Sequence, residues 1–307
     1  MLRFYFLGFC YFLISNISAQ EFQINYRVVC ELPTEISESS GLVMDAEGNF
    51  WTHGDGKNPS ELYQFDTLGN LLRTLSFKNI QNVDWEDITI DHDGNFWIGD
   101  VGNNDSDRED LALYKVSNPN LHDSDEVWAS ALSINYPDQS VIPSPIGNRN
   151  FDVEGIAFFR DSILLITKNR AYPNSGYAKV YTVPAVPGKL EARLLDSFYT
   201  ETNIQLGRIT GADFLPKENV LVLNSLRRIY TIPLIEQRFE FDSLKVYRMD
   251  YHTNQFESIV YKGNGVGYMT AEKPSVFCEF ILSDTMFDFP AKLHSMDQRD
   301  MPFVYDG

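Results

Sequence analysis

Short apolar runs, each bounded by Gly, Asp or Asn, recur along most of the chain. Apolar runs of this length are typical of β-strands, and no stretch sustains the period of about 3.6 residues that marks an amphipathic helix. The chain is therefore expected to be all-β. The first cycle contains four expected strands, at 41–45, 49–55, 62–67 and 71–77. Equivalent runs follow at 87–91, 95–100, 111–116 and 129–136, at 155–159, 163–168, 178–183 and 191–199, and at 211–215, 220–225, 228–232 and 243–249.

Each four-strand cycle begins with a similar sequence, such as "DWEDITIDHDGNFWIGD" or "DVEGIAFFRDSILLITK". The opening positions align at Gly41, Asp87, Gly155, Gly211 and Ser258, at intervals of about 46 to 68 residues. Repeats of this length with several strands each indicate a β-propeller. The second strand of each cycle is almost continuously apolar, as expected for a blade that packs between two neighbours.

The last cycle supplies only three strands, "ESIVY", "VGYMTAE" and "VFCEFIL", while "FQINYRVVCEL" (22–32) is a strand without a cycle. A terminal strand often completes the last blade of a propeller, so we predict five four-stranded blades closed by the N-terminal strand. Cys30 lies in that strand and Cys278 in the last cycle. A lone cysteine pair in an exported protein tends to be oxidised. We therefore expect a Cys30–Cys278 disulfide; two buried free thiols are the alternative.

The N-terminal sequence "MLRFYFLGFCYFLISNISAQ" has a basic residue, an apolar stretch and a small-residue end at Ser18-Ala19. This pattern predicts a signal peptide at 1–19 and export to the periplasm or the extracellular medium. Residues 20–307, about 290 residues, are expected to form a single propeller domain. No later segment is long and apolar enough to span a bilayer, so we expect no membrane insertion.

The chain carries 43 acidic and 25 basic residues, a formal net charge of −18. Such a surface repels nucleic acid and anionic membranes, which excludes both as expected partners. It suits a protein kept soluble and monomeric by self-repulsion, or a protein that collects cations. A small molecule or another secreted protein is the expected partner.

With these segments, the chain resembles a broad group of secreted β-propellers related to the phytase-like and SdiA-regulated families. The resemblance is carried by "WTHGDG" (51–56), "DWEDITID" (84–91) and "GDVGNNDSDREDLALYKV" (99–116), and it extends over about residues 38–234. It implies a propeller fold. The group is usually six-bladed, so a sixth blade before Asp152 is the alternative to five. Many members have no assigned reaction, and the resemblance implies no particular activity.

Blade strands run outward from a central channel, so equivalent positions converge there. The position before the aligned residue is acidic in three cycles, as Glu86, Glu154 and Glu257. Repulsion between such carboxylates raises their pKa values and favours binding of a cation. An all-oxygen ligand set suits calcium, with Asp100 and Asn103 as neighbouring ligands. In the structural alternative, the acids cap backbone amides and lock the blades together.

A second set of candidates lies near the ends of the second strands. We expect ligand contacts from His53, Asp55, Lys168, Arg170, Glu272 and Lys273. The acidic loop 103–110 resembles a calcium loop, but it lacks the Gly and the final Glu of the EF-hand pattern and is interpreted as an exposed loop.

Two functions stay open from the sequence. The first is a ligand- or protein-binding propeller with a polar, calcium-binding funnel. The second is a metal-dependent hydrolase of phosphate esters or lactones, in which the metal polarises the substrate oxygen while Lys168, Arg170 and Lys273 hold an anion. The sequence does not decide whether the protein is an enzyme.

Overall fold

The computed structural model describes residues 21–249 and 255–286, so the predicted signal peptide at 1–19 lies outside the described residues. These residues form β-strands joined by turns, as predicted. The helical elements among them are short: α1 (Ile204–Gly207) and three 3₁₀ turns at Pro119–Leu121, Ile146–Asn148 and Phe241–Ser243. None of these helices has the length and hydropathy needed to cross a membrane.

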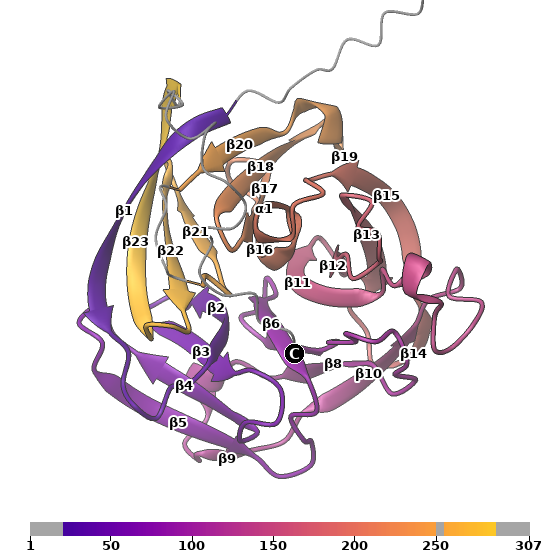
Figure 1. Ribbon diagram of the computed structural model, residues 1–307. Helices are drawn as coiled ribbons and strands as arrows, with labels where there is room; N and C mark the ends of the chain where they lie inside the picture. The colour runs from indigo at the N-terminus through magenta and orange to yellow at the C-terminus, as the bar shows by residue number, and fades with distance from the viewer. Residues whose placement is uncertain (1–20, 250–254, 287–307) are drawn as a thin grey trace, which may run out of the picture.

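The fold is a β-propeller whose blades are antiparallel sheets, and the described residues contain five groups of four strands (Figure 1). The first blade is β2 (Ser39–Met44), β3 (Phe50–Gly54), β4 (Glu61–Phe65) and β5 (Leu71–Phe77). The second blade is β6 (Trp85–Ile90), β7 (Phe96–Asp100), β8 (Ala112–Val116) and β10 (Ser130–Asn135). The third blade is β11 (Asp152–Phe159), β12 (Ser162–Lys168), β13 (Tyr177–Pro184) and β15 (Arg193–Tyr199).

The fourth blade is β16 (Ile209–Leu215), β17 (Val220–Ser225), β18 (Arg228–Ile235) and β20 (Lys245–Arg248). The fifth blade combines β21 (Val260–Gly263), β22 (Val266–Ala271) and β23 (Val276–Met286) with the N-terminal strand β1 (Glu21–Glu31). Strand β1 pairs antiparallel with β23, as predicted, and its first residues pair in parallel with β20. Three short strands extend these sheets, β9 (Glu126–Val127), β14 (Gly188–Glu191) and β19 (Arg238–Phe239).

The first strands of the blades form a closed ring around the centre (Figure 1). Strand β2 contacts β6, β6 contacts β11, β11 contacts β16, β16 contacts β21, and β21 contacts β2. Between the blades lie separate apolar clusters, one at each interface, including the interface between the fifth and first blades. Burial of apolar surface on both faces of every blade therefore holds the ring together and explains why the second strands are apolar throughout.

Several hairpins share an Asp-X-X-Gly-Asn turn whose aspartate organises the backbone. Asp45 accepts hydrogen bonds from the amides of Glu47 and Asn49 and from the Trp51 indole. Asp91 makes the equivalent contacts in the second blade. The turn glycine has φ 88° at Gly48, a left-handed conformation that side chains disfavour. The repeat thus preserves both the turn and the link from the turn to a buried tryptophan.

The predicted disulfide is wrong, because Cys30 and Cys278 are both free. They lie on the paired strands β1 and β23, but a bulge offsets the register so that Val28 faces Cys278 and Phe277 faces Cys30. Successive residues of a strand point to opposite faces. Cys278 therefore packs between the fourth and fifth blades, whereas Cys30 packs toward the first blade.

Candidate functional site

The inner strands approach one another closely where each repeat begins. A Cβ added to Gly155 would lie 2.9 Å from the Ala212 Cβ, and one added to Gly41 would lie 2.9 Å from the Ile88 amide nitrogen. Glycine at these aligned positions therefore allows neighbouring blades to touch. Glu154 precedes Gly155, and Glu86 precedes Asp87, which is the aligned residue of the second blade. Both glutamates lie at the N-terminal ends of inner strands.

Acidic side chains from three blades converge at this end of the channel, named here the carboxylate mouth. Two groups have carboxylate oxygens that all lie within 4.8 Å of one another and could hold a metal ion. The first group is Asp55, Asp84 and Glu86; the second is Glu86, Asp152 and Glu154. Glu86 belongs to both groups, so the two form one continuous cluster. Glu86 and Glu154 lie next to each other in the structure, as their equivalent positions in the repeat predicted.

The side of the cluster on the third blade is balanced by basic residues. Lys168 Nζ lies 2.8 Å from Glu154 Oε1, and Arg170 bridges Asp152 Oδ2 at 2.5 Å and Glu154 Oε1 at 2.9 Å. Burial alone would raise the pKa of Asp152, but the charges of Arg170 and Lys168 outweigh it and hold this pKa below its usual value. Asp152 is therefore ionised, and Asp152 and Glu154 are both paired with basic residues of the chain.

The side formed by Asp55, Asp84 and Glu86 is not balanced. Within the described residues, none of these carboxylates forms an ion pair with lysine or arginine at 4.0 Å or less. Burial raises the pKa of Asp55 to about 6, and burial together with the Asp55 charge raises the pKa of Asp84 to about 6. Burial and then the Glu154 charge raise the pKa of Glu86 well above its usual value. Charge of one sign is concentrated here without a partner.

Two glycines leave space around these oxygens. A Cβ added to Gly56 would lie 2.2 Å from Asp84 Oδ1. A Cβ added to Gly102 would lie 2.2 Å from Glu86 Oε1 and 2.3 Å from Asp84 Oδ2. Any larger residue at either position would push the carboxylates apart, so the backbone itself forms part of the cradle.

Two predicted metal ligands are used in other contacts. Asp100 is buried, and its carboxylate accepts from Arg108 at 2.9 Å and from the Asp84 amide at 3.0 Å. The Asn103 side-chain oxygen accepts from the amides of Asp107 and Arg108 and so closes the acidic loop that follows it. Neither residue belongs to the two carboxylate groups.

Other predicted residues surround the cluster at different depths. Burial raises the pKa of Glu257 to about 8, and its charge is coupled to Lys168, Glu154 and Asp55, which places it at the same mouth. Glu272 is half-buried, with its pKa raised by burial, and Lys273 is exposed. His53 is fully buried below the mouth, where burial lowers its pKa to about 4 and its Nε2 has no hydrogen-bond partner.

Asp84 and Asp152 were missing from the candidates drawn from the sequence. Each stands two residues before a predicted glutamate, in "DWE" and "DVE". Residues two apart along an extended segment point to the same side, so this repeated Asp-X-Glu spacing was the available signal.

Below the carboxylate mouth, Asp87 closes the centre of the ring. Its Oδ2 accepts hydrogen bonds from the amides of Ile156 at 2.8 Å and Ala212 at 3.1 Å, and its Oδ1 accepts from the Ile88 amide at 2.9 Å. One buried carboxylate of the second blade is thus fixed to the third and fourth blades. The sequence suggested, as an alternative to cation binding, that acidic residues at the position of Glu86 cap backbone amides and lock the blades together. Asp87, one residue later, has this role.

No family description matches this sequence, and no curated protein matches it. Solved structures similar to the chain are themselves remote. The PQQ-bound aldose sugar dehydrogenase from Streptomyces coelicolor is 10% identical, with a TM-score of 0.48 over 86% of this chain and 100% of that chain. A putative gluconolactonase is 13% identical, with a TM-score of 0.45 over 82% and 76%. A catalytically inactive virginiamycin B lyase from Staphylococcus aureus is 13% identical, with a TM-score of 0.40 over 82% and 69%. Likeness at this level says nothing about what this chain binds or catalyses.

Proposed function

We propose that the protein is a ligand-binding β-propeller whose carboxylate mouth holds a divalent cation, best fitted by Ca²⁺. The observation that carries the proposal is the group Asp55, Asp84 and Glu86, whose oxygens lie within 4.8 Å of one another with no basic partner in the described residues. Like charges at this distance repel strongly in a buried site. A cation would remove that repulsion and return the pKa values of all three groups toward or below their usual range.

The chemistry of the ligands selects the type of cation. The group contains only carboxylates, without histidine or cysteine, and oxygen-only sites favour Ca²⁺, Mg²⁺ or Mn²⁺ over zinc and copper. Asp55 follows β3, whereas Asp84 and Glu86 lie two residues apart at the start of β6. Carboxylates placed in this way form a less regular cage than the near-octahedral geometry that Mg²⁺ requires, which favours Ca²⁺. Asp152 and Glu154 are already neutralised by Arg170 and Lys168 and are not needed as direct ligands.

A cation held by these carboxylates would retain open coordination positions, because Ca²⁺ takes about six to eight oxygen ligands. Water or the oxygens of a small ligand would fill them. We therefore assign the mouth to an oxygen-rich small molecule, such as a carboxylate or a polyol, that approaches the cation from solvent.

Metal-dependent hydrolysis of a phosphate ester or lactone is the second candidate, and one observation favours it. Glu257, with its pKa raised to about 8 by burial, holds its proton at neutral pH beside the carboxylate cluster. A protonated carboxyl group near a metal can act as the general acid for a leaving oxygen, while a metal polarises the bond that breaks. Against an anion-binding role, Lys168 and Arg170 already pair with acids of the chain.

Calcium titration of the EDTA-treated protein by calorimetry tests the proposal. We expect a single saturable site in the chain from residue 20, lost in Glu86→Gln and retained in Glu191→Gln, which removes an exposed charge on the distant strand β14. Absence of Ca²⁺ and Mg²⁺ binding, or equal binding by Glu86→Gln, would overturn the cation site. Hydrolysis of p-nitrophenyl phosphate or a γ-lactone that requires Ca²⁺ and is lost in Glu257→Gln would make the protein a hydrolase; calcium binding without such turnover supports the binding protein.

A further inference from the structure

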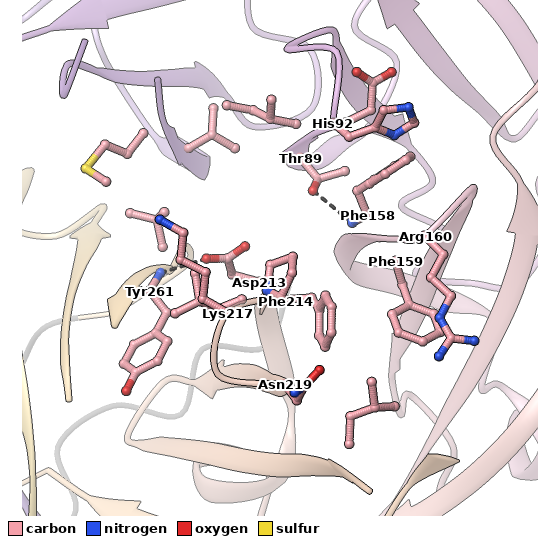
Figure 2. A pocket seen from close by; sticks show the side chains of 18 of the residues that line it. Thr89, His92, Phe158, Phe159, Arg160, Asp213, Phe214, Lys217, Asn219 and Tyr261 are labelled. Atoms are coloured by element: carbon pink, nitrogen blue, oxygen red, sulfur yellow. Dashed lines mark hydrogen bonds between the residues drawn. The ribbon is translucent and has the colours of Figure 1, made fainter. Parts of the chain in front are cut away.

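The opposite end of the channel contains a cavity of about 720 Å³. All five inner strands run in the same sense through the ring, so the carboxylates lie at their beginnings and this cavity lies at their ends. Among the residues that line it are Val43, Thr89, Phe158, Asp213 and Val260, one from each of the five blades. We name it the distal mouth (Figure 2).

The distal mouth is separated from the carboxylate mouth by the centre of the ring. The Asp87 carboxylate spans the second, third and fourth blades, and the fully buried His53 fills the side of the first blade. A Cβ added to Gly41 would lie 2.8 Å from His53 Nε2, so no free space remains between them. Occupation of the distal mouth therefore needs no cation and no residue of the site proposed above.

The walls of the distal mouth are apolar and held in place. Aromatic rings from adjacent blades, Phe159 and Phe214, pack edge to face at 5.0 Å between centroids. Thr89 Oγ1 accepts the Phe158 amide at 2.9 Å, and Asp213 Oδ2 accepts the Tyr261 amide at 2.7 Å (Figure 2). These bonds tie the wall of each blade to that of the next. A cavity of this volume with fixed apolar walls falls in the range of small-molecule sites.

Basic residues gather at the rim of this cavity although the chain as a whole is acidic. Arg160, Lys217 and Lys262 line it, and none forms an ion pair within the described part of the chain. Figure 2 shows Lys217 and Arg160 on either side of the Phe159 and Phe214 rings. The Arg160 guanidinium lies 4.7 Å from the centre of the Phe159 ring.

Most acidic residues that line the cavity already interact with other groups of the chain. Asp91 pairs with Lys115 at 3.1 Å and accepts from the turn that follows it. Asp213 accepts the Tyr261 amide. Asp161 is the exposed acid that remains at the rim. With Asp91 paired to Lys115, the three basic side chains of the lining face two carboxylates, Asp161 and Asp213, so the net charge at the rim is positive.

From this arrangement we propose that the distal mouth is a second binding site, for a small organic anion with a flat apolar body. The aromatic walls take the flat body of the ligand. Lys217 and Lys262 take its carboxylate at the rim, and Arg160 closes the opposite side. The recognised chemistry is that of an arylcarboxylate.

Calorimetric titration with naphthalene-2-carboxylate, beside the uncharged naphthalene-2-carboxamide, tests the proposal. We expect the acid to bind at least tenfold more tightly than the amide, and the double variant Lys217→Glu, Lys262→Glu to weaken acid binding at least tenfold. Both lysines are exposed, so the variant keeps its fold, which its unfolding midpoint verifies. Lys189→Glu, a single Lys-to-Glu change on the remote strand β14, and Glu86→Gln are expected to bind the acid as the wild type does.

Three outcomes would overturn the proposal: no binding of the acid, equal binding of acid and amide, or undiminished binding of the acid by the double variant. Because Glu86→Gln removes the proposed cation site without touching the distal mouth, failure of either proposal is seen separately. Loss of naphthalene-2-carboxylate binding in Glu86→Gln would also count against two independent sites.

Discussion

The Asp87 carboxylate accepts a hydrogen bond of 3.1 Å from the Ala212 amide, two blades further along the ring. The same side chain also accepts the amides of Ile156 and Ile88. Within residues 21–249 and 255–286, no other side-chain hydrogen bond joins blades that are not neighbours. One residue therefore links three of the inner strands at the point where the channel is closed.

Asp87→Ala should be strongly destabilising, because it leaves three buried amides without an acceptor. An unpaired buried donor costs about 1–3 kcal/mol, so we expect the free energy of unfolding to fall by roughly 3 kcal/mol or more. Asp87→Asn keeps one acceptor oxygen and should cost less. Urea unfolding of both variants measures the difference, and a loss below about 1 kcal/mol for Asp87→Ala would show that water replaces the carboxylate.

Lys168 and Glu154 should be strongly coupled, because both side chains are nearly buried at 13% and 6% exposure. Removing one member of a buried pair costs about 3–5 kcal/mol, whereas removing both costs less. We expect Lys168→Met to lower the free energy of unfolding by about 3 kcal/mol and Lys168→Met with Glu154→Gln to recover part of that loss. If the loss of unfolding free energy in the double variant equals the sum of the losses in Lys168→Met and Glu154→Gln, the two side chains are not coupled, and Arg170 alone balances Glu154.

The architecture could be predicted from the sequence because each local sequence pattern was consistent with blades packed in a closed ring. Apolar second strands, Gly-containing turns and an unpartnered N-terminal strand all follow from packing each blade between two others. Glu86 and Glu154 were found for the same reason, since equivalent positions of a repeat meet at the axis.

Most of the remaining site contacts are not encoded in the repeat spacing. Asp84 lies beside Glu86 through its local Asp-X-Glu spacing, but only the three-dimensional approach of neighbouring blades brings Asp55 and Asp152 to Glu86. Asp100 was predicted as a ligand, but Arg108, eight residues later, turns back onto it. The cysteine prediction failed on a single β-bulge, because a shift of one residue reverses the face to which a side chain points.

Reducing agents should leave the stability of the folded protein unchanged, because Cys30 and Cys278 are free thiols on opposite faces of one blade. We expect equal thermal midpoints with and without dithiothreitol for the chain from residue 20. Burial raises the pKa of Cys278 to about 12, so maleimide should label the half-buried Cys30 first. A Cys30–Cys278 linked peptide in the mass spectrum of a non-reduced digest would contradict this assignment.

Without a cation, the protein should lose stability as the pH rises. Asp55 and Asp84 have pKa values raised by burial to about 6, against 3.8 for an unperturbed aspartate. Between these values the folded state binds more protons than the unfolded state, so the free energy of unfolding falls as pH increases through this window. We expect thermal midpoints in EDTA to decrease from pH 4 to pH 7, and to decrease less in Asp84→Asn. Identical profiles for the two proteins would exclude Asp84 as a contributor.

Gly102→Ala should weaken cation binding while the fold persists. The added Cβ would lie 2.2 Å from Glu86 Oε1 and 2.3 Å from Asp84 Oδ2, so both carboxylates must move apart. The contacted atoms are the ends of side chains, which can shift without moving the backbone, and the φ of Gly102 is not in the left-handed region. Because a cation needs both oxygens at coordination distance, we expect its affinity to fall at least tenfold.

Gly147→Ala is the matched control, since its added Cβ would meet nothing closer than 3.9 Å. Calcium titration of both variants, with unfolding midpoints measured alongside, gives the comparison. Equal calcium affinities for Gly102→Ala and Gly147→Ala would contradict a cation site at Glu86 and Asp84, because the added Cβ of Gly102→Ala displaces both carboxylates.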